Sequence, residues 1–242
     1  MNDTTTPLPL LEVQNLTAGY GQLPVLSNIS LEIYRAEIVA LVGSNGAGKT
    51  TLLRALSRVL PCSGSIILNG DQLSGATSDE AFSLGMVQIP EGRQLFDRMT
   101  VQDNLLMGAY RRRDKGAVAR DLEKTYALFP RLSERRRQLA GSMSGGEQQL
   151  CAMARALMAA PVLLMVDEMS LGLAPVIVEQ LVEILVNIQR EGMTVLLVEQ
   201  DIHLALSVAD RGYVMETGHI VQSGLAKALI DDPNVRQAYL GI

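Results

Sequence analysis

The chain is poor in aromatic, thiol and imidazole side chains. Aromatic residues make up 4% of its 242 residues, tryptophan is absent, and there are only two cysteines and two histidines. Two cysteines argue against a disulfide framework, and Cys62 and Cys151 lack the spacing of metal ligands. The hydrophobic content is nevertheless 48%. We therefore expect an aliphatic core, which suits a parallel sheet covered by helices on both faces.

Long apolar runs and a basic surplus are also missing. The nearest approach to a membrane span, residues 157–166, is interrupted by Pro161 and falls short of the roughly 18 residues that a transmembrane helix needs. The N-terminal segment MNDTTTPLPLLEV lacks the basic and apolar regions of a signal peptide. A net charge of -5 argues against a nucleic-acid partner held by a basic surface. We expect a cytoplasmic protein that reaches a membrane only through a partner.

The periodicity of apolar residues predicts strands in both end portions of the chain. Short β-branched or alternating runs indicate strands at residues 11–17, 28–33, 37–42, 65–70, 85–90, 162–168 and 194–198. A helix is predicted between Pro175 and Gly192, and residues 205–221 read as a helix followed by a β-hairpin that turns at Gly218.

The middle of the chain has a different pattern. Residues 100–129 are helical in periodicity, residues 131–141 form a polar, basic helix end or connector, and residues 143–161 form a helix closed by Pro161. We therefore expect a mainly helical subdomain at about residues 90–160. Its basic runs are interpreted as a solvated face.

A glycine-rich loop carries the clearest chemical signal. Residues 43–50, GSNGAGKT, fit the pattern G-x-x-x-x-G-K-[ST], with an apolar strand before it and a helix after it. Glycines let successive N–H groups point at phosphate oxygens, and the helix N-terminus adds its dipole. Lys49 is predicted to reach the β- and γ-phosphates and Thr50 to ligate Mg²⁺. The alternative is a glycine-rich turn with a chance Lys-Thr.

Asp167 and Glu168 end the apolar strand VLLMV. Asp167 can hold Mg²⁺ through water, opposite Thr50, and Glu168 can polarise an attacking water. Such a pair often does no more than start a solvated loop. Its position after a phosphate loop favours the functional interpretation.

The segment SGGEQ, residues 144–148, begins a predicted helix. Ser144 and Glu147 form a capping box, which satisfies N–H groups of the first turn. Capping does not explain Gly145 and Gly146, which each cost roughly 1 kcal/mol relative to alanine inside a helix. Bare N–H groups at this terminus would suit the close approach of an anion.

These three motifs, in this order, resemble the nucleotide-binding subunit of ABC transporters over essentially the whole chain. SLGLAP, IPEGRQLF and LVEQ…ADRGYVMETGHIV look closest to the LivF-type ATPase of branched-chain amino-acid importers. The resemblance implies an α/β P-loop NTPase with the ABC ATPase fold. That fold has a mixed sheet core, an N-terminal antiparallel β subdomain and an inserted α-helical subdomain. It implies one domain over 1–242, with the ATP-binding core at 1–89 and 161–242 and the signature subdomain at about 90–160.

The resemblance also implies the cofactors ATP and Mg²⁺ and assigns residues to them. Tyr20 matches the aromatic that stacks on adenine, although a turn tyrosine is the alternative. Asp167 matches the Walker B aspartate, a Mg²⁺ ligand, and Glu168 matches the catalytic glutamate that acts with Lys49. The Walker A loop comprises Gly43, Ser44, Asn45, Gly46, Ala47, Gly48, Lys49, Thr50 and Thr51. The signature motif, which in this family contacts the γ-phosphate bound by the opposite subunit, comprises Ser144, Gly145, Gly146, Glu147 and Gln148.

Several positions depart from the common family pattern. Glu91 stands where the Q-loop glutamine is usual, Leu171 and Ala174 where the D-loop serine and aspartate are usual, and Gln200 at the position of the switch histidine. These departures leave open whether this chain's own site carries a full set of hydrolytic groups. His203, three residues further on, falls on the polar side of a predicted helix and is interpreted as a solvated residue.

The resemblance implies a subunit that binds and hydrolyses ATP to energise an importer, with branched-chain amino acids as the expected cargo. Its partners would be transmembrane permease subunits, a second ABC ATPase subunit, and indirectly a periplasmic or extracellular binding protein. A LivG-type heterodimer is favoured over a homodimer. The permease is expected to contact residues 91–99 and the helix from Thr100, at the cytoplasmic face of a bacterial inner membrane. The alternatives are the ATPase of a urea or amide importer, a soluble ABC ATPase without transport, and a regulator that never hydrolyses ATP.

Overall fold

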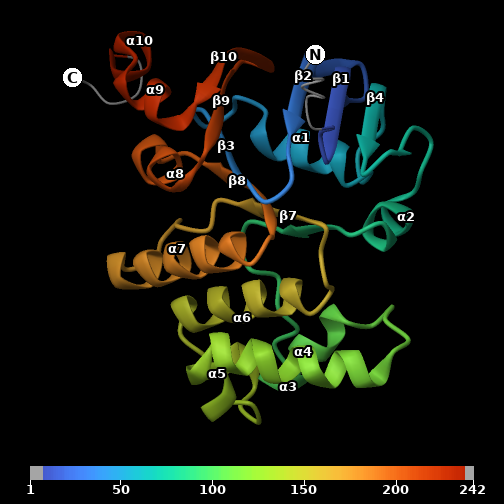
Figure 1. Ribbon diagram of the computed structural model, residues 1–242, viewed down its shortest axis with the longest axis vertical. Coiled ribbons are helices and arrows are strands. Elements are labelled where there is room, and N and C mark those ends of the chain that lie inside the picture. Colours follow the sequence, from blue (N-terminus) through green and yellow to red (C-terminus); the bar gives the residue numbers. More distant parts are fainter. Residues whose placement is uncertain (1–7, 238–242) are drawn as a thin grey trace, which may run out of the picture.

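The computed structural model describes residues 8–237. Two sheets form the upper half of the molecule in Figure 1, and helices α3 to α6 form the lower half. Residues 1–7, which make up much of the segment predicted not to be a signal peptide, and residues 238–242 lie outside this description. Among the described residues, no helix combines the length and the apolar character needed to cross a membrane.

The larger sheet is mixed, as the sequence predicts. Its six strands have the order β10-β9-β3-β8-β7-β6, and only β10 pairs antiparallel, with β9. The smaller sheet is antiparallel, with the order β2-β1-β4-β5. The strands are β1 Leu11–Tyr20, β2 Leu23–Ile33, β3 Ile38–Val42, β4 Cys62–Leu68, β5 Asp71–Gln72, β6 Met86–Ile89, β7 Leu163–Asp167, β8 Thr194–Glu199, β9 Arg211–Glu216 and β10 His219–Leu225.

Helices cover the larger sheet and form the lower half of the molecule. They are α1 Lys49–Leu56, α2 Ser78–Ser83, α3 Val101–Gly108, α4 Lys115–Leu128, α5 Pro130–Glu134, the 3-10 turn η1 Ala140–Ser142, α6 Gly145–Leu157, α7 Pro175–Arg190, α8 Ile202–Val208, α9 Ala226–Asp231 and α10 Pro233–Val235. The predicted helix after Pro175 and the hairpin turn at Gly218 are confirmed, and Gly218 has the left-handed backbone that the turn requires (φ 78°).

Two hydrophobic clusters occupy the two faces of the larger sheet. Ile38, Ala40 and Val42 of β3 belong to the cluster with α3, α6, α7 and α8, whereas Val39 and Leu41 belong to the cluster with α1 and the antiparallel sheet. This alternation is the period of two of a β-strand. Because both faces are buried, the central strands read as continuous apolar runs in the sequence.

The helical pattern over residues 100–129 does not form one helix. α3 ends at Gly108, and α4 begins at Lys115 with Asp114 as its N-cap. The Arg112 guanidinium donates a hydrogen bond to Met158 O, 2.9 Å away, so the intervening segment is tied to the end of α6. A Cβ at Gly108 would lie 1.9 Å from Arg155 O. The close contact of α3 with α6 therefore requires glycine there, and tertiary packing overrides the local periodicity.

Candidate functional site

The loop from Gly43 to Gly48 connects the end of β3 to the start of α1. A Cβ on Gly43 would meet Met215 O at 2.3 Å, so only glycine fits against the end of β9. Gly48 begins α1 with a left-handed backbone (φ 106°), and no side chain caps the helix. The first N–H groups of α1 are therefore available to an anion.

Lys49 places its ammonium group inside this loop. Its side chain is 4% exposed, and Nζ donates hydrogen bonds to Gly43 O at 2.8 Å and Ser44 O at 3.3 Å. Nζ also forms an ion pair with Glu168 Oε1 at 3.2 Å. These partners satisfy a buried cation and hold it at the mouth of the phosphate loop.

The acidic pair lies where β7 ends, opposite α1. Asp167 is 1% exposed, and its Oδ1 is 3.5 Å from the Thr50 hydroxyl. Its Oδ2 is buried and has no hydrogen-bond partner within residues 8–237. Burial, and then the charge of Glu168, raise the pKa of Asp167 to about 6.

This arrangement fits a bound Mg²⁺ ion. A buried polar atom without a partner calls for an explanation, and a carboxylate oxygen beside a hydroxyl is a donor set that Mg²⁺ accepts alongside substrate phosphates. The residues that would hold the ion are Asp167 and Thr50, whose side chains the fold brings to within 3.5 Å of each other.

A cleft of about 500 Å³ joins the remaining predicted residues to the loop. It is lined by Tyr20, Val25, residues 44–51, Glu91, Glu168, Leu171 and Gln200. The positions of the Q-loop glutamine and of the switch histidine thus face the same space as Lys49 and Glu168. The fold brings together residues that are separated by up to 180 positions in the chain.

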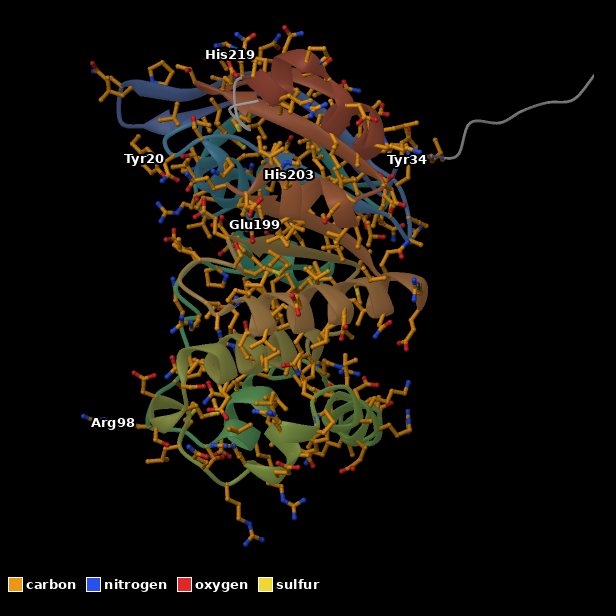
Figure 2. The ribbon with its side chains drawn as sticks, turned by 90° about the vertical axis from the view of Figure 1, so that its left-hand side faces the viewer. Tyr20, Tyr34, Arg98, Glu199, His203 and His219 are labelled. Carbon is orange, nitrogen blue, oxygen red and sulfur yellow. The ribbon has the colours of Figure 1, made fainter. Side chains whose placement is uncertain are left out.

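Tyr20 stands at the outer end of the cleft, at the tip of β1 (Figure 2). Its side chain is 45% exposed, and its hydroxyl accepts a hydrogen bond from Arg54 of α1 at 3.0 Å. Hydrogen bonds from Thr51 and Arg54 lower the pKa of Tyr20. The ring is therefore tethered to the helix that follows the phosphate loop while its face stays accessible.

The predicted capping box at the start of α6 is confirmed. Ser144 Oγ donates to Glu147 Oε2 at 2.9 Å and accepts from the Glu147 N–H at 3.4 Å. Arg135 pairs with Glu147 at 3.2 Å. None of residues 144–148 lines the cleft of this chain's own phosphate loop.

The two glycines of SGGEQ have packing reasons that the sequence did not reveal. A Cβ on Gly145 would lie 3.0 Å from the guanidinium nitrogens of Arg93, and one on Gly146 would lie 2.9 Å from Ile177 of α7. Arg93 also donates a weak hydrogen bond to Gln148 at 3.4 Å. The first turn of α6 thus packs against Arg93 and Ile177 on one side, while Ser144 stays exposed and the two glycines are half-buried.

Sequence reasoning also missed Glu199, the last residue of β8. Its carboxylate is 1% exposed and accepts hydrogen bonds from the N–H and hydroxyl of Ser170. The available signal was a carboxylate that closes the otherwise apolar run TVLLV. His203 is exposed on α8 (Figure 2), in agreement with the prediction of a solvated residue.

Comparison with known proteins gives consistent matches. The family model described as "ABC transporter" matches residues 26–170. The chain is 47% identical over 233 residues to the high-affinity branched-chain amino acid transport ATP-binding protein BraG of Pseudomonas aeruginosa, covering 96% of this chain and 100% of BraG. It is 32% identical to the probable branched-chain amino acid transport ATP-binding protein LivF of Archaeoglobus fulgidus, covering 96% and 99% of the two chains.

Two solved structures share the fold. An ATP-binding subunit of an ABC transporter superposes with a TM-score of 0.82 at 27% identity, covering 96% of each chain. An ATP-binding cassette of an ABC transporter in its ADP conformation superposes with a TM-score of 0.85 at 24% identity, covering 97% of this chain and all of the other. The second match is evidence for the fold alone.

Proposed function

The chain belongs to the ABC transporter family as an ATP-binding ATPase subunit, and from this premise we propose that it energises the import of branched-chain amino acids. The observation that carries the mechanism is the placement of Lys49, Thr50 and Glu168 around one cleft, with the buried Asp167 carboxylate beside the Thr50 hydroxyl and one of its oxygens without a partner in residues 8–237. The cargo is proposed from the relatives, because BraG and LivF are described as branched-chain amino acid transport ATP-binding proteins.

ATP binds in the cleft with its phosphates along the loop from Gly43 to Thr51 and its adenine against Tyr20. The phosphate oxygens replace Glu168 as the partner of Lys49, and the 3.2 Å ion pair opens. Asp167 and Thr50 would hold Mg²⁺, which would neutralise negative charge on the phosphates. The freed Glu168 carboxylate is then able to orient water.

Glu168 accepts a proton from the attacking water as its oxygen bonds to the γ-phosphorus. The bond from that phosphorus to the bridging oxygen of ADP breaks, and ADP and phosphate leave. Gln200 and Glu91 contact the same space from its other walls. Neither is needed to accept the proton, so their departures from the family pattern are compatible with hydrolysis.

The signature residues 144–148 act on the nucleotide of a second ATPase subunit. Their distance from this chain's own cleft supports that role, since they line none of it. The partner subunit is of LivG type, with a homodimer as the alternative. The single domain is divided at about residues 90 and 160, with helices α3 to α6 in the signature subdomain.

Transmembrane permease subunits dock on the helical half of the molecule, and a binding protein outside the membrane acts through them. Large apolar side chains are exposed there, at Phe96, Met99, Leu106, Met107 and Tyr110. Arg98 projects from the same half in Figure 2. Several large apolar side chains exposed on one half of a molecule, beside charged residues, would suit a protein interface. The chain is therefore peripheral, at the cytoplasmic face of a bacterial inner membrane.

Transport into vesicles that hold the complete transporter tests this function. Lys49→Ala should abolish ATP-driven leucine uptake, whereas Glu183→Gln, on the exposed side of α7, should not change it. Full uptake with Lys49→Ala would contradict the mechanism. Competition by urea or short amides but not by valine or isoleucine would favour the alternative cargo. Recovery of the chain from native membranes without a permease would favour a soluble ATPase.

A further inference from the structure

Glu199 and Ser170 connect the ends of two neighbouring parallel strands. Asp167, the last residue of β7, pairs in register with Val198 of β8, and Glu199 follows. Glu199 Oε1 accepts the Ser170 N–H at 3.1 Å, and Oε2 accepts the Ser170 hydroxyl at 2.9 Å. Figure 2 labels Glu199 above the helices of the lower half of the molecule, and its exposure is 1%. Ser170 lies two residues after Glu168.

The backbone of Glu168 is in an unfavourable conformation. Its φ of 46° is in the left-handed region, which residues other than glycine rarely adopt. Such a conformation persists only where the surrounding structure fixes it. The Glu168 N–H donates to Val198 O at 2.9 Å, and the next fixed point along the chain is Ser170. The turn over residues 168–170 is therefore attached to β8 by three hydrogen bonds, two of which Ser170 donates to Glu199.

Packing anchors the middle of this turn, because Met169 is 1% exposed and belongs to the hydrophobic cluster that includes α6 and α7, whereas Ser170 and Leu171 lie beside open clefts. The nucleotide cleft lies on one side, and a second cleft of about 570 Å³ includes Ser170, Glu199 and His203 in its walls. Both clefts are lined by Glu168, Leu171 and Gln200. Leu171, directly after Ser170, is exposed. With open space on two sides of Ser170, the hydrogen bonds to Glu199 fix the end of the turn that the burial of Met169 leaves free.

We propose that Glu199 is a positioning residue for ATP hydrolysis. Its hydrogen bonds with Ser170 fix the turn that contains Glu168 and thereby orient the Glu168 carboxylate. The inference rests on the proposed role of Glu168. Burying a carboxylate is unfavourable unless donors satisfy it, and burial raises the pKa of Glu199 to about 7. An apolar residue would close β8 at a lower cost. The carboxylate is explained by the two donors of Ser170, which its two oxygens accept.

Steady-state hydrolysis by the complete transporter, with ATP affinity measured separately by equilibrium binding, tests this role. Glu199→Ala should lower kcat about tenfold and leave KM for Mg-ATP within about twofold. The variant changes the orientation of the Glu168 carboxylate but leaves the phosphate loop intact. Glu199→Gln should recover most of kcat, since its carbonyl oxygen still accepts the Ser170 N–H. Ser170→Ala should lower kcat about threefold, and the double variant Glu199→Ala/Ser170→Ala should be no slower than Glu199→Ala.

Matched controls are Ser207→Ala, whose hydroxyl donates to Leu204 O within α8 and has no other partner in residues 8–237, and Glu183→Gln on α7. A kcat within twofold of wild type in Glu199→Ala would overturn the proposal. So would equal losses of kcat and ATP affinity that Glu199→Gln does not restore. Should Glu199→Ala fail to fold, the kcat and KM of Ser170→Ala decide in the same way.

Glu168→Gln, assayed in parallel, separates this proposal from the function on which it depends. Full hydrolysis by Glu168→Gln would show that the role of Glu168 is wrong. A strong defect in Glu168→Gln together with normal rates in both Glu199→Ala and Ser170→Ala would overturn only the positioning role of Glu199.

Discussion

The ends of β7 and β8 lie side by side and use a buried carboxylate in opposite ways. Asp167 and Glu199 are each 1% exposed. Asp167 leaves one oxygen without a partner among the described residues, whereas both oxygens of Glu199 accept hydrogen bonds from Ser170. A buried carboxylate oxygen without a hydrogen-bond partner indicates a binding site for a ligand. A buried carboxylate whose oxygens both accept hydrogen bonds indicates a structural role. Exposure alone does not distinguish these two roles.

The residues that follow the two carboxylates extend the comparison. Glu168 follows Asp167 and Gln200 follows Glu199, and both line the nucleotide cleft. Only Glu168 carries a group that can accept a proton at neutral pH. We therefore assign proton transfer to Glu168, at the end of β7. We assign the positioning of Glu168 to Glu199, at the end of β8.

The largest expected effect is at Glu168. Glu168→Gln should lower the kcat of ATP hydrolysis by about 10²- to 10⁴-fold, because an amide cannot act as the general base. ATP affinity should change little, since the phosphate loop is intact. The measurement is phosphate release by the assembled transporter, with equilibrium ATP binding alongside it. Gln200→Ala, the matched substitution at the end of β8, should lower kcat far less than Glu168→Gln does. Equal losses at the two positions would remove the distinction.

The pH dependence of stability should differ between wild type and Glu199→Gln. The pKa of Glu199 is about 7 in the folded chain, above its ordinary value of 4.5. The folded state therefore holds a proton that the unfolded state releases. This contribution to stability is fully present below pH 4.5 and is lost as the pH rises through about 7, a change on the order of 3 kcal/mol.

Glu199→Gln should remove this part of the dependence, because an amide does not titrate. Denaturant unfolding between pH 4.5 and 8 measures the change in the free energy of unfolding. Asp167, whose pKa is raised to about 6, contributes in the same direction, so some slope should remain in the variant. An unchanged slope in Glu199→Gln would show that the carboxylate titrates normally.

The sequence predicted the local motifs, including the acidic pair after β7, far better than it predicted the role of Glu199 at the end of β8. The phosphate loop, the acidic pair and the capping box are local patterns, and each lies where it was expected. The tie between Glu199 and Ser170 spans 29 positions and exists only because β7 and β8 pair in register. The contact of Arg93 with Gly145 and the break after Gly108 likewise depend on packing between distant segments. Periodicity and spacing carry no information about such contacts.

Magnesium dependence should separate the two carboxylates. Asp167→Asn should raise the Mg²⁺ concentration for half-maximal hydrolysis on the order of tenfold or more, since each 1.4 kcal/mol of lost affinity is a factor of ten. Glu199→Gln should leave that midpoint unchanged even if its kcat falls, because both of its oxygens face Ser170. Titration of Mg²⁺ into the protein stripped with EDTA measures the midpoint. A shift of the same size in both variants would mean that Glu199 also serves the ion.

The smallest effect is expected at Gln200. Gln200→His should change kcat by no more than about threefold at pH 8, where an imidazole with a pKa near 6.5 is neutral, like the amide. Below that pKa the imidazolium should alter the rate, because position 200 lines the same cleft as Lys49 and Glu168. The ratio of variant to wild-type rates between pH 5.5 and 8.5 isolates this new titration. His203→Gln, an exposed change three residues away, is the control and should give a flat ratio. A flat ratio for Gln200→His as well would mean that position 200 does not influence the γ-phosphate, and that the β8 end acts through Glu199 alone.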